Sequence, residues 1–232
     1  MKQKEILSDI IAYPTPEAKV VQARMQELRS LGIQSVVNFG NEILLQHSVL
    51  GKGYCGVVVL AQWLNSSREE ITAALKIRRT DSPRDSLILE AKGLAIANGF
   101  GIGPTLYANS PNFIVMEYIQ GLSLHQWLQT DPPRSLIFET VENILHQCYQ
   151  LDQWGLDHGN VRCVTDHVIM QGNKPVLIDF SSSSCDRKPA NVTTIIPGLF
   201  WSTKLAPFLR HHCSPQLKER LIPLLRQYKQ SP

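Results

Sequence analysis

A glycine-rich stretch before the middle of the chain has the residue types and spacing of a phosphate-binding turn. Residues Gly51-Lys52-Gly53-Tyr54-Cys55-Gly56-Val57-Val58 match the pattern G-x-G-x-x-G-x-V, and a strand-like run containing Lys76 follows them. Glycines in a turn between strands let backbone N–H groups approach phosphate oxygens, because no Cβ stands in the way. A lysine on the next strand adds a positive charge for the same phosphates. Together these residues predict a nucleotide clamp.

The glycines alone are a weak indication, because tight hairpins and dinucleotide-binding turns also collect glycine. In a dinucleotide site a helix follows the glycine turn directly. Here the apolar run Val57-Val58-Val59-Leu60-Ala61 follows, which is typical of a strand. The sequence therefore excludes the dinucleotide interpretation.

A second candidate for chemistry is Asp179, which closes the otherwise apolar strand Val176-Leu177-Ile178-Asp179-Phe180. An unpaired carboxylate is costly to bury beside apolar residues, so this position favours a partner cation. Lys76, taken alone, is more typical of a surface lysine, and Met116 of core packing.

The elements that must position these residues divide the chain into a strand-rich first half and a helical second half. Hydrophobic periodicity and turn residues predict a β-β-β-α-β-β order, with strands near 43–50, 57–63, 71–78, 104–108 and 113–118. Ser82-Pro83-Arg84-Asp85 has the residues of a capping box and predicts a helix from there to Gly99. Glu90 would lie on the sheet-facing side of that helix.

Helices dominate the prediction elsewhere. A helix from Thr15 to Gly32 precedes the strands, and a helix ending at Gly155 has Ile137, Val141, Ile144, Cys148 and Leu151 on one face. Strands near 168–170 and 176–180 and a closing helix after Pro215 complete the chain. We expect an N-terminal helical extension over 1–42, a strand-rich lobe over 43–120 and a helical lobe over 121–232.

This order of motifs resembles that of the protein kinases, from about Leu50 to Phe180. The resemblance implies an α+β, bilobal kinase-like fold with a five-stranded first lobe, and ATP with Mg²⁺ or Mn²⁺ as cofactors. Asp179-Phe180-Ser181 stands where kinases have D-F-G, so Asp179 would bind the metal. Lys76 would contact the α and β phosphates and pair with Glu90. The other residues implied at the nucleotide are Gly51, Gly53, Gly56, Val58, Ala74, Met116, Glu117 and Ile119, the last two through the Glu117 carbonyl and the Ile119 N–H.

The catalytic loop departs from the family, because His158-Gly159-Asn160 replaces H-R-D or H-G-D. Asn160 thus takes the position of the catalytic base. A loop two residues longer than usual puts His167 in the place of the metal-binding asparagine, with Asp166 beside it as the alternative ligand. Magnesium prefers oxygen ligands, which favours Asp166, whereas the spacing favours His167.

Only 53 residues follow Asp179, so a long activation segment does not fit. The short second lobe is similar to that of RIO-type kinases, of the small kinase in the tRNA threonylcarbamoylation complex and, most of all, of small prokaryotic predicted serine/threonine kinases. The segment Arg187-Lys188-Pro189-Ala190-Asn191-Val192-Thr193 supports that last comparison, without a role that the sequence defines.

Composition narrows the class of protein. The chain has 232 residues, 43% of them hydrophobic, and a formal net charge of +3, which gives no signal for nucleic-acid binding. The basic cluster Arg78, Arg79 and Arg84 is expected to be a solvated face or a weak anion attractor. Five scattered cysteines suggest neither disulfides nor zinc, and His211-His212-Cys213 is more typical of a solvated run than of a metal site. Without a signal-peptide core or a membrane-length apolar run, we expect a cytoplasmic protein.

Three functions are compatible with these residues. The first is an atypical serine/threonine protein kinase, slow because an amide at Asn160 orients the acceptor hydroxyl but cannot take its proton. The second is a nucleotide-binding pseudokinase that acts as an interaction module. The third is a small-molecule phosphotransferase of the aminoglycoside-kinase type, although the large helical insert and acidic cleft of that group are not visible. The sequence defines neither the protein substrate or partner nor the oligomeric state.

Overall fold

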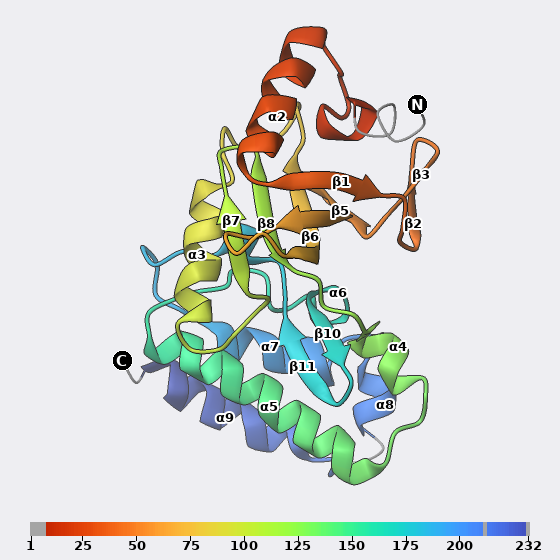
Figure 1. Ribbon diagram of the computed structural model, residues 1–232. Coiled ribbons are helices and arrows are strands. Elements are labelled where there is room, and N and C mark those ends of the chain that lie inside the picture. The colour runs from red at the N-terminus through yellow and green to blue at the C-terminus, as the bar shows by residue number, and fades with distance from the viewer. Residues whose placement is uncertain (1–7, 211–212, 231–232) are drawn as a thin grey trace. The chain divides into compact units, whose positions relative to one another are not determined.

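The computed structural model describes residues 8–210 and 213–230, which form an α+β protein. Figure 1 shows most of the strands in the first half of the chain and most of the helices in the second. The chain divides into two compact units. The first comprises Met1–Ala95 and Pro104–Tyr118, and the second comprises Ile96–Gly103 and Ile119–Pro232.

An antiparallel sheet forms the centre of the first unit. Its five-strand path is β1 (Ile33–Val37), β5 (Gly56–Leu64), β6 (Glu70–Arg78), β8 (Phe113–Glu117) and β7 (Leu106–Asn109), and β4 (Gly51–Lys52) also pairs with β5. The central strand β6 is buried continuously from Ala73 to Ile77, because it has neighbours on both edges and covered faces. This strand carries Lys76 in the middle of the sheet.

The prediction of a five-stranded sheet is confirmed, but one of the five strands was assigned to the wrong segment of the chain. The segment predicted as a strand at 43–50 forms a separate hairpin of β2 (Glu42–Leu44) and β3 (His47–Val49). Leu45 turns the chain there with a φ of 57°, which a continuous strand cannot accommodate. The sheet edge is instead occupied by β1, which no pattern predicted.

The helix α2 (Ala18–Ser30) begins slightly later than predicted. Thr15 is held outside it, because its N–H donates to Thr80 Oγ1 at 3.3 Å. Within α2 the buried Arg24 donates to the backbone carbonyls of Ile11 and Arg78, the latter at 2.7 Å. Burial and the neighbouring Arg78 lower the pKa of Arg24 to about 10, so it remains charged at neutral pH. The Arg24 guanidinium thus links α2 to β6 by a hydrogen bond.

The helix α3 (Ile88–Asn98) also starts later than predicted. Ser82 does not cap it, because the Ser82 hydroxyl accepts the N–H of Arg84 in a local turn. The hydroxyl that accepts from the first turn is that of Ser86, which takes the N–H of Ile88 at 3.0 Å. The predicted buried side is confirmed by Leu87, Glu90, Ala91 and Leu94, all of which are buried.

The second unit is built around the long helix α5 (Arg134–Gln153), which ends before Gly155 as predicted. Its buried face includes four of the five predicted residues, but Thr140 is buried where Val141 was expected. Beside α5 lies a hairpin of β10 (Val168–Gln171) and β11 (Lys174–Leu177), to which β9 (Leu122–Ser123) adds a third strand. The short helices α4 (Leu124–Leu128) and α6 (Val164–His167) flank it.

The end of the chain forms α7 (Asn191–Phe200), α8 (Ala206–Arg210) and α9 (Leu217–Gln230). Figure 1 shows α9 alongside α5. The ring centres of Tyr228 on α9 and Tyr149 on α5 lie 6.4 Å apart. Sequence patterns predicted only α9, in which none of the residues is fully buried. His211 and His212 lie outside the described residues. Within the described part, no helix is long and apolar enough to span a bilayer.

Candidate functional site

The glycine-rich stretch forms a tight hairpin between β4 and β5. Gly53 N–H donates to the Gly56 carbonyl at 2.8 Å, and Gly51 and Lys52 pair with Val58 and Val57. A Cβ on Gly56 would lie 2.9 Å from the Ile77 carbonyl oxygen and 3.4 Å from Lys76 Cε, so only glycine fits there. A Cβ on Gly51 would meet no atom within 4 Å. The hairpin therefore packs closely at Gly56, beside Lys76, and has open space at Gly51.

Lys76 and Glu90 form a buried ion pair in the first unit. The Lys76 Nζ lies 2.5 Å from Glu90 Oε1, and the two side chains are 9% and 5% exposed. This confirms the prediction that Lys76 on β6 pairs with Glu90 on the buried side of α3. Two charges this far from water require each other, because desolvation of either one alone is unfavourable. Glu90 therefore fixes the direction of the lysine stem next to Gly56.

Several other residues predicted to contact a nucleotide share one face of this sheet. Val58 lies opposite Lys76 in the β5–β6 register, and Met116 lies opposite Ala74 in the β6–β8 register. Directly opposed residues point their side chains to the same face, as do residues two apart on one strand. Val58, Ala74, Lys76 and Met116 therefore form one surface.

The remaining two predicted nucleotide residues, Glu117 and Ile119, were assigned through backbone groups rather than side chains. Glu117 ends β8, and its carboxylate accepts from the Thr105 N–H at 3.1 Å and hydroxyl at 2.9 Å. Ile119 belongs to the second unit and is buried. The side chain of Glu117 thus has a structural role, which leaves its backbone carbonyl as the group for the predicted contact.

The arginine cluster is not the open basic face expected from the sequence. Arg79 pairs with Asp81 at 2.6 Å and donates to the Gly53 carbonyl at 3.3 Å. Arg78 donates to the Arg84 carbonyl at 3.0 Å. The ring of Tyr13 lies 5.1 Å from the Arg79 guanidinium. Arg79 therefore braces the glycine hairpin, and the sequence did not indicate that role.

In the second unit, Asp179 follows β11 in a left-handed backbone conformation with φ 64° and ψ 73°. Non-glycine residues rarely adopt it, and such strain is typical of functional positions. The Asp179 carboxylate accepts the Ser181 N–H at 3.3 Å, and the side chain is 33% exposed. A third of the carboxylate side chain therefore faces solvent.

His167 is the residue that the structure brings to Asp179. Its Nδ1 lies 3.0 Å from the Asn160 carbonyl oxygen, which can only accept, so Nδ1 carries a proton. The other ring nitrogen, Nε2, lies 3.5 Å from Asp179 Oδ2. In a neutral ring Nε2 bears a lone pair, so two acceptors would face each other there. A cation between them would relieve this contact. The other predicted ligand, Asp166, is exposed on α6.

Asn160 is half-buried and lies in the loop before α6. Its side-chain oxygen accepts from the Cys163 thiol at 3.4 Å, and its carbonyl also accepts the Cys163 N–H at 3.1 Å. These bonds, with that of His167, orient the residue predicted at the position of a catalytic base.

His158 is a buried neutral histidine behind that loop. Its Nε2 donates to the Ile178 carbonyl at 3.1 Å, and its Nδ1 has no hydrogen-bond partner in the described part of the structure. Burial, reinforced by the nearby His167, lowers the pKa of His158 from its usual 6.5 to about 4. Its ring also packs on Phe180 at 4.7 Å between ring centres. His158 therefore joins the loop of Asn160 to the strand end that carries Asp179.

This pKa predicts an acid-sensitive fold. Below pH 6.5 the unfolded state takes up a proton on His158 that the folded state refuses until about pH 4. Stability should therefore be full above pH 6.5 and fall as the pH decreases towards 4. Between pH 7 and pH 5 the free energy of unfolding should fall by about 2 kcal/mol from this group. Urea unfolding at both pH values, with His158→Gln as the non-titrating control, measures it. Equal falls in both proteins would contradict the assignment.

The chain matches no known protein-family model and no curated protein. Among the described residues, no group of three or more His, Cys, Asp and Glu side chains is placed to hold a metal ion. The case for a function therefore depends on the chemistry of two sets of residues. The first is the glycine hairpin with Lys76 and Glu90, and the second is the Asn160 loop with His167 and Asp179.

Proposed function

We propose that the protein is an ATP-dependent and magnesium-dependent phosphotransferase, an atypical serine/threonine protein kinase. The observation that carries this proposal is the buried Lys76–Glu90 pair at 2.5 Å, directly beside the glycine hairpin. A fold gains little stability from an ion pair in this place, because the cost of desolvation offsets the attraction. A positioned lysine next to glycine N–H groups is, however, what phosphates require.

In this proposal the fold is kinase-like. The glycine hairpin and Lys76 bind the phosphates, and the face of Val58, Ala74 and Met116 receives the adenine. The Glu117 carbonyl and the Ile119 N–H would bind the adenine edge.

Asp179 and His167 fit a divalent cation. Asp179 offers a partly exposed carboxylate, and the contact of His167 Nε2 with Asp179 Oδ2 at 3.5 Å is one that a cation would stabilise. A bound magnesium ion would neutralise charge on the phosphates during transfer. Asn160 would orient the acceptor hydroxyl without taking its proton, so we propose a slow enzyme.

One observation favours a second candidate, a nucleotide-binding module without transfer activity. The Asn160 side-chain oxygen already accepts from Cys163, and an amide has no basic site for the hydroxyl proton. Both functions need ATP binding, and only the first needs transfer.

Calorimetric titration of ATP with magnesium tests the shared step. Lys76→Ala and Asp179→Asn should each weaken ATP binding at least tenfold, because each removes a charge complementary to the phosphate–metal group. Lys92→Ala, which removes an exposed lysine from α3, is the matched control and should bind as the wild type does. Absence of heat up to millimolar ATP would overturn both functions. Transfer of γ-phosphate to protein in a cell extract would then distinguish the kinase from the binding module.

A further inference from the structure

Two segments of the second unit lie antiparallel beside the candidate site. Asp157 N–H donates to the Ser184 carbonyl at 3.0 Å, and Ser184 N–H donates to the Asp157 carbonyl at 2.8 Å. One segment leads from Asp157 to Asn160, and the other leads from Asp179 to Ser184. The two residues proposed to act on the acceptor hydroxyl and on the metal are therefore each a few residues from the same bridge.

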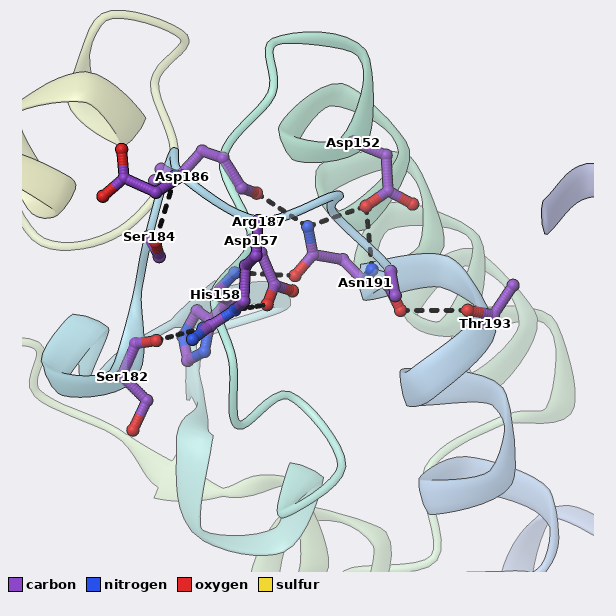
Figure 2. Close-up of polar contacts among 11 residues, drawn as sticks. Asp152, Asp157, His158, Ser182, Ser184, Asp186, Arg187, Asn191 and Thr193 are labelled. Atoms are coloured by element: carbon purple, nitrogen blue, oxygen red, sulfur yellow. Dashed lines mark hydrogen bonds and ion pairs between the residues drawn. The ribbon is translucent and has the colours of Figure 1, made fainter. Parts of the chain in front are cut away.

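Arg187 joins the same two segments with its side chain, as Figure 2 shows. Its Nε donates to the Asp157 carboxylate, and its Nη2 donates to the Ser182 carbonyl. The Asp157 side chain is 13% exposed, whereas that of Arg187 is 49% exposed. A planar guanidinium suits this role, because it presents several donors in a fixed geometry to two acceptors at once.

Gly159 shows how closely the loop fits against this arginine. Its φ of +80° is a conformation that favours glycine, and an added Cβ would lie 2.3 Å from both Arg187 Nη2 and the Ser182 carbonyl oxygen. The backbone between His158 and Asn160 thus lies directly against the Arg187–Ser182 contact.

The opposite side of the loop is held by a buried amide. Asn191, at the start of α7, accepts the His158 N–H at 2.9 Å and donates to the Leu156 carbonyl at 2.8 Å. Its own N–H and side-chain amide donate to Asp152, which also accepts from Tyr228. Asn191 is fully buried, so its contacts belong to the folded core of the unit, in contrast to the half-exposed Arg187.

From this geometry we infer that Arg187 is a positioning residue for phosphoryl transfer. It fixes the separation between the loop of Asn160 and the segment of Asp179 by holding Asp157 and Ser182 together. This inference rests on the proposed function, because it assigns Arg187 to the same reaction. A shift of the acceptor-orienting residue relative to the metal ligand would slow transfer while ATP still binds, since reactions of this kind depend on alignment.

The test compares Arg187→Gln with Lys188→Gln. The control removes the same charge one residue away, where Lys188 Nζ donates to the Lys229 carbonyl at 3.1 Å instead. We expect Arg187→Gln to lower kcat for phosphoryl transfer at least tenfold, with the Kd for ATP within twofold of the wild type. Lys188→Gln should change neither. Asp157→Asn should reproduce the loss, and the double variant Asp157→Asn, Arg187→Gln should be no worse than either single one.

Hydrogen exchange gives a readout that is independent of activity. The Asp157 and Ser184 N–H groups should exchange at least tenfold faster in Arg187→Gln, because the bridge opens without the arginine. Exchange at Asn191, on the other side of the loop, should stay unchanged. Unchanged exchange at Asp157 and Ser184 would overturn the inference, as would an unaltered kcat. If the wild type binds ATP but transfers no phosphate, the kinase function fails, and exchange alone then decides whether Arg187 holds the two segments.

Discussion

Replacement of Lys76 by methionine is expected to lower the free energy of unfolding by about 3 kcal/mol, because it removes the ammonium that pairs with a buried carboxylate. The Glu90 carboxylate is 5% exposed and lies 2.5 Å from the ammonium that the substitution removes. Urea unfolding of the two proteins at pH 7 measures this difference.

The double variant Lys76→Met, Glu90→Leu separates stability from function. With both charges replaced by apolar side chains of similar size, the free energy of unfolding should return to within about 1 kcal/mol of the wild type. ATP binding should nevertheless remain at least tenfold weaker, since the lysine proposed to bind the phosphates is gone. A double variant that binds ATP as the wild type does would show that this pair serves the fold alone. If it is as unstable as Lys76→Met, the loss of stability does not come from the stranded carboxylate.

The second large effect concerns the chemistry at Asn160. Asn160→Asp supplies a carboxylate where the acceptor proton must go, so phosphoryl transfer should rise at least tenfold while the Kd for ATP stays nearly unchanged. A base acts on the transition state and not on nucleotide binding. Single-turnover transfer from ATP to a generic basic protein measures the change.

The controls for this experiment are the two neighbouring carboxylates. The structure favours neither as a substitute base, since Asp157 is paired with Arg187 and Asp166 lies exposed on α6. If one of them is the base, its replacement by alanine should abolish transfer, and Asn160→Asp should then add nothing. The four proteins compared are the wild type, Asn160→Asp, Asp157→Ala and Asp166→Ala. If none of them transfers phosphate although all bind ATP, the binding module is left as the function.

The parts of the candidate site that lie on regular elements were predictable from the sequence. Lys76 lies in the apolar strand run from Ala73 to Ile77 and Glu90 on the apolar side of a helix, whereas their pairing with each other was implied by the resemblance to protein kinases. The strand β6 was predictable from its continuous apolar run, and the helix α5 from its long hydrophobic repeat. The start of α3 was less predictable from the sequence, because Ser82 and Ser86 both have cap-forming side chains and only the surrounding contacts decide between them.

The remaining features depend on contacts between distant segments. The strand β1 has five residues and takes its place from pairing with β5, which local residue types do not encode. The bond of Asn191 to His158 joins residues 33 positions apart, and nothing in the segment around Asn191 distinguishes it from an ordinary surface amide. The choice of His167 over Asp166 at Asp179 follows from the phase of the short helix α6, which spans only Val164–His167.

The buried arginine of α2 has a consequence for how the chain can be shortened. Arg24 supplies N–H donors to the Ile11 and Arg78 carbonyls and to Asn112, whose amide in turn donates to Glu27 at 2.8 Å. Deletion of the first thirty residues would remove Arg24 and Glu27. The Arg78 carbonyl on β6 and the Asn112 side chain before β8 would then lose these hydrogen-bond partners. The N-terminal segment is therefore an integral layer of the first unit, and a truncated protein that begins at Leu31 would lack groups its sheet needs.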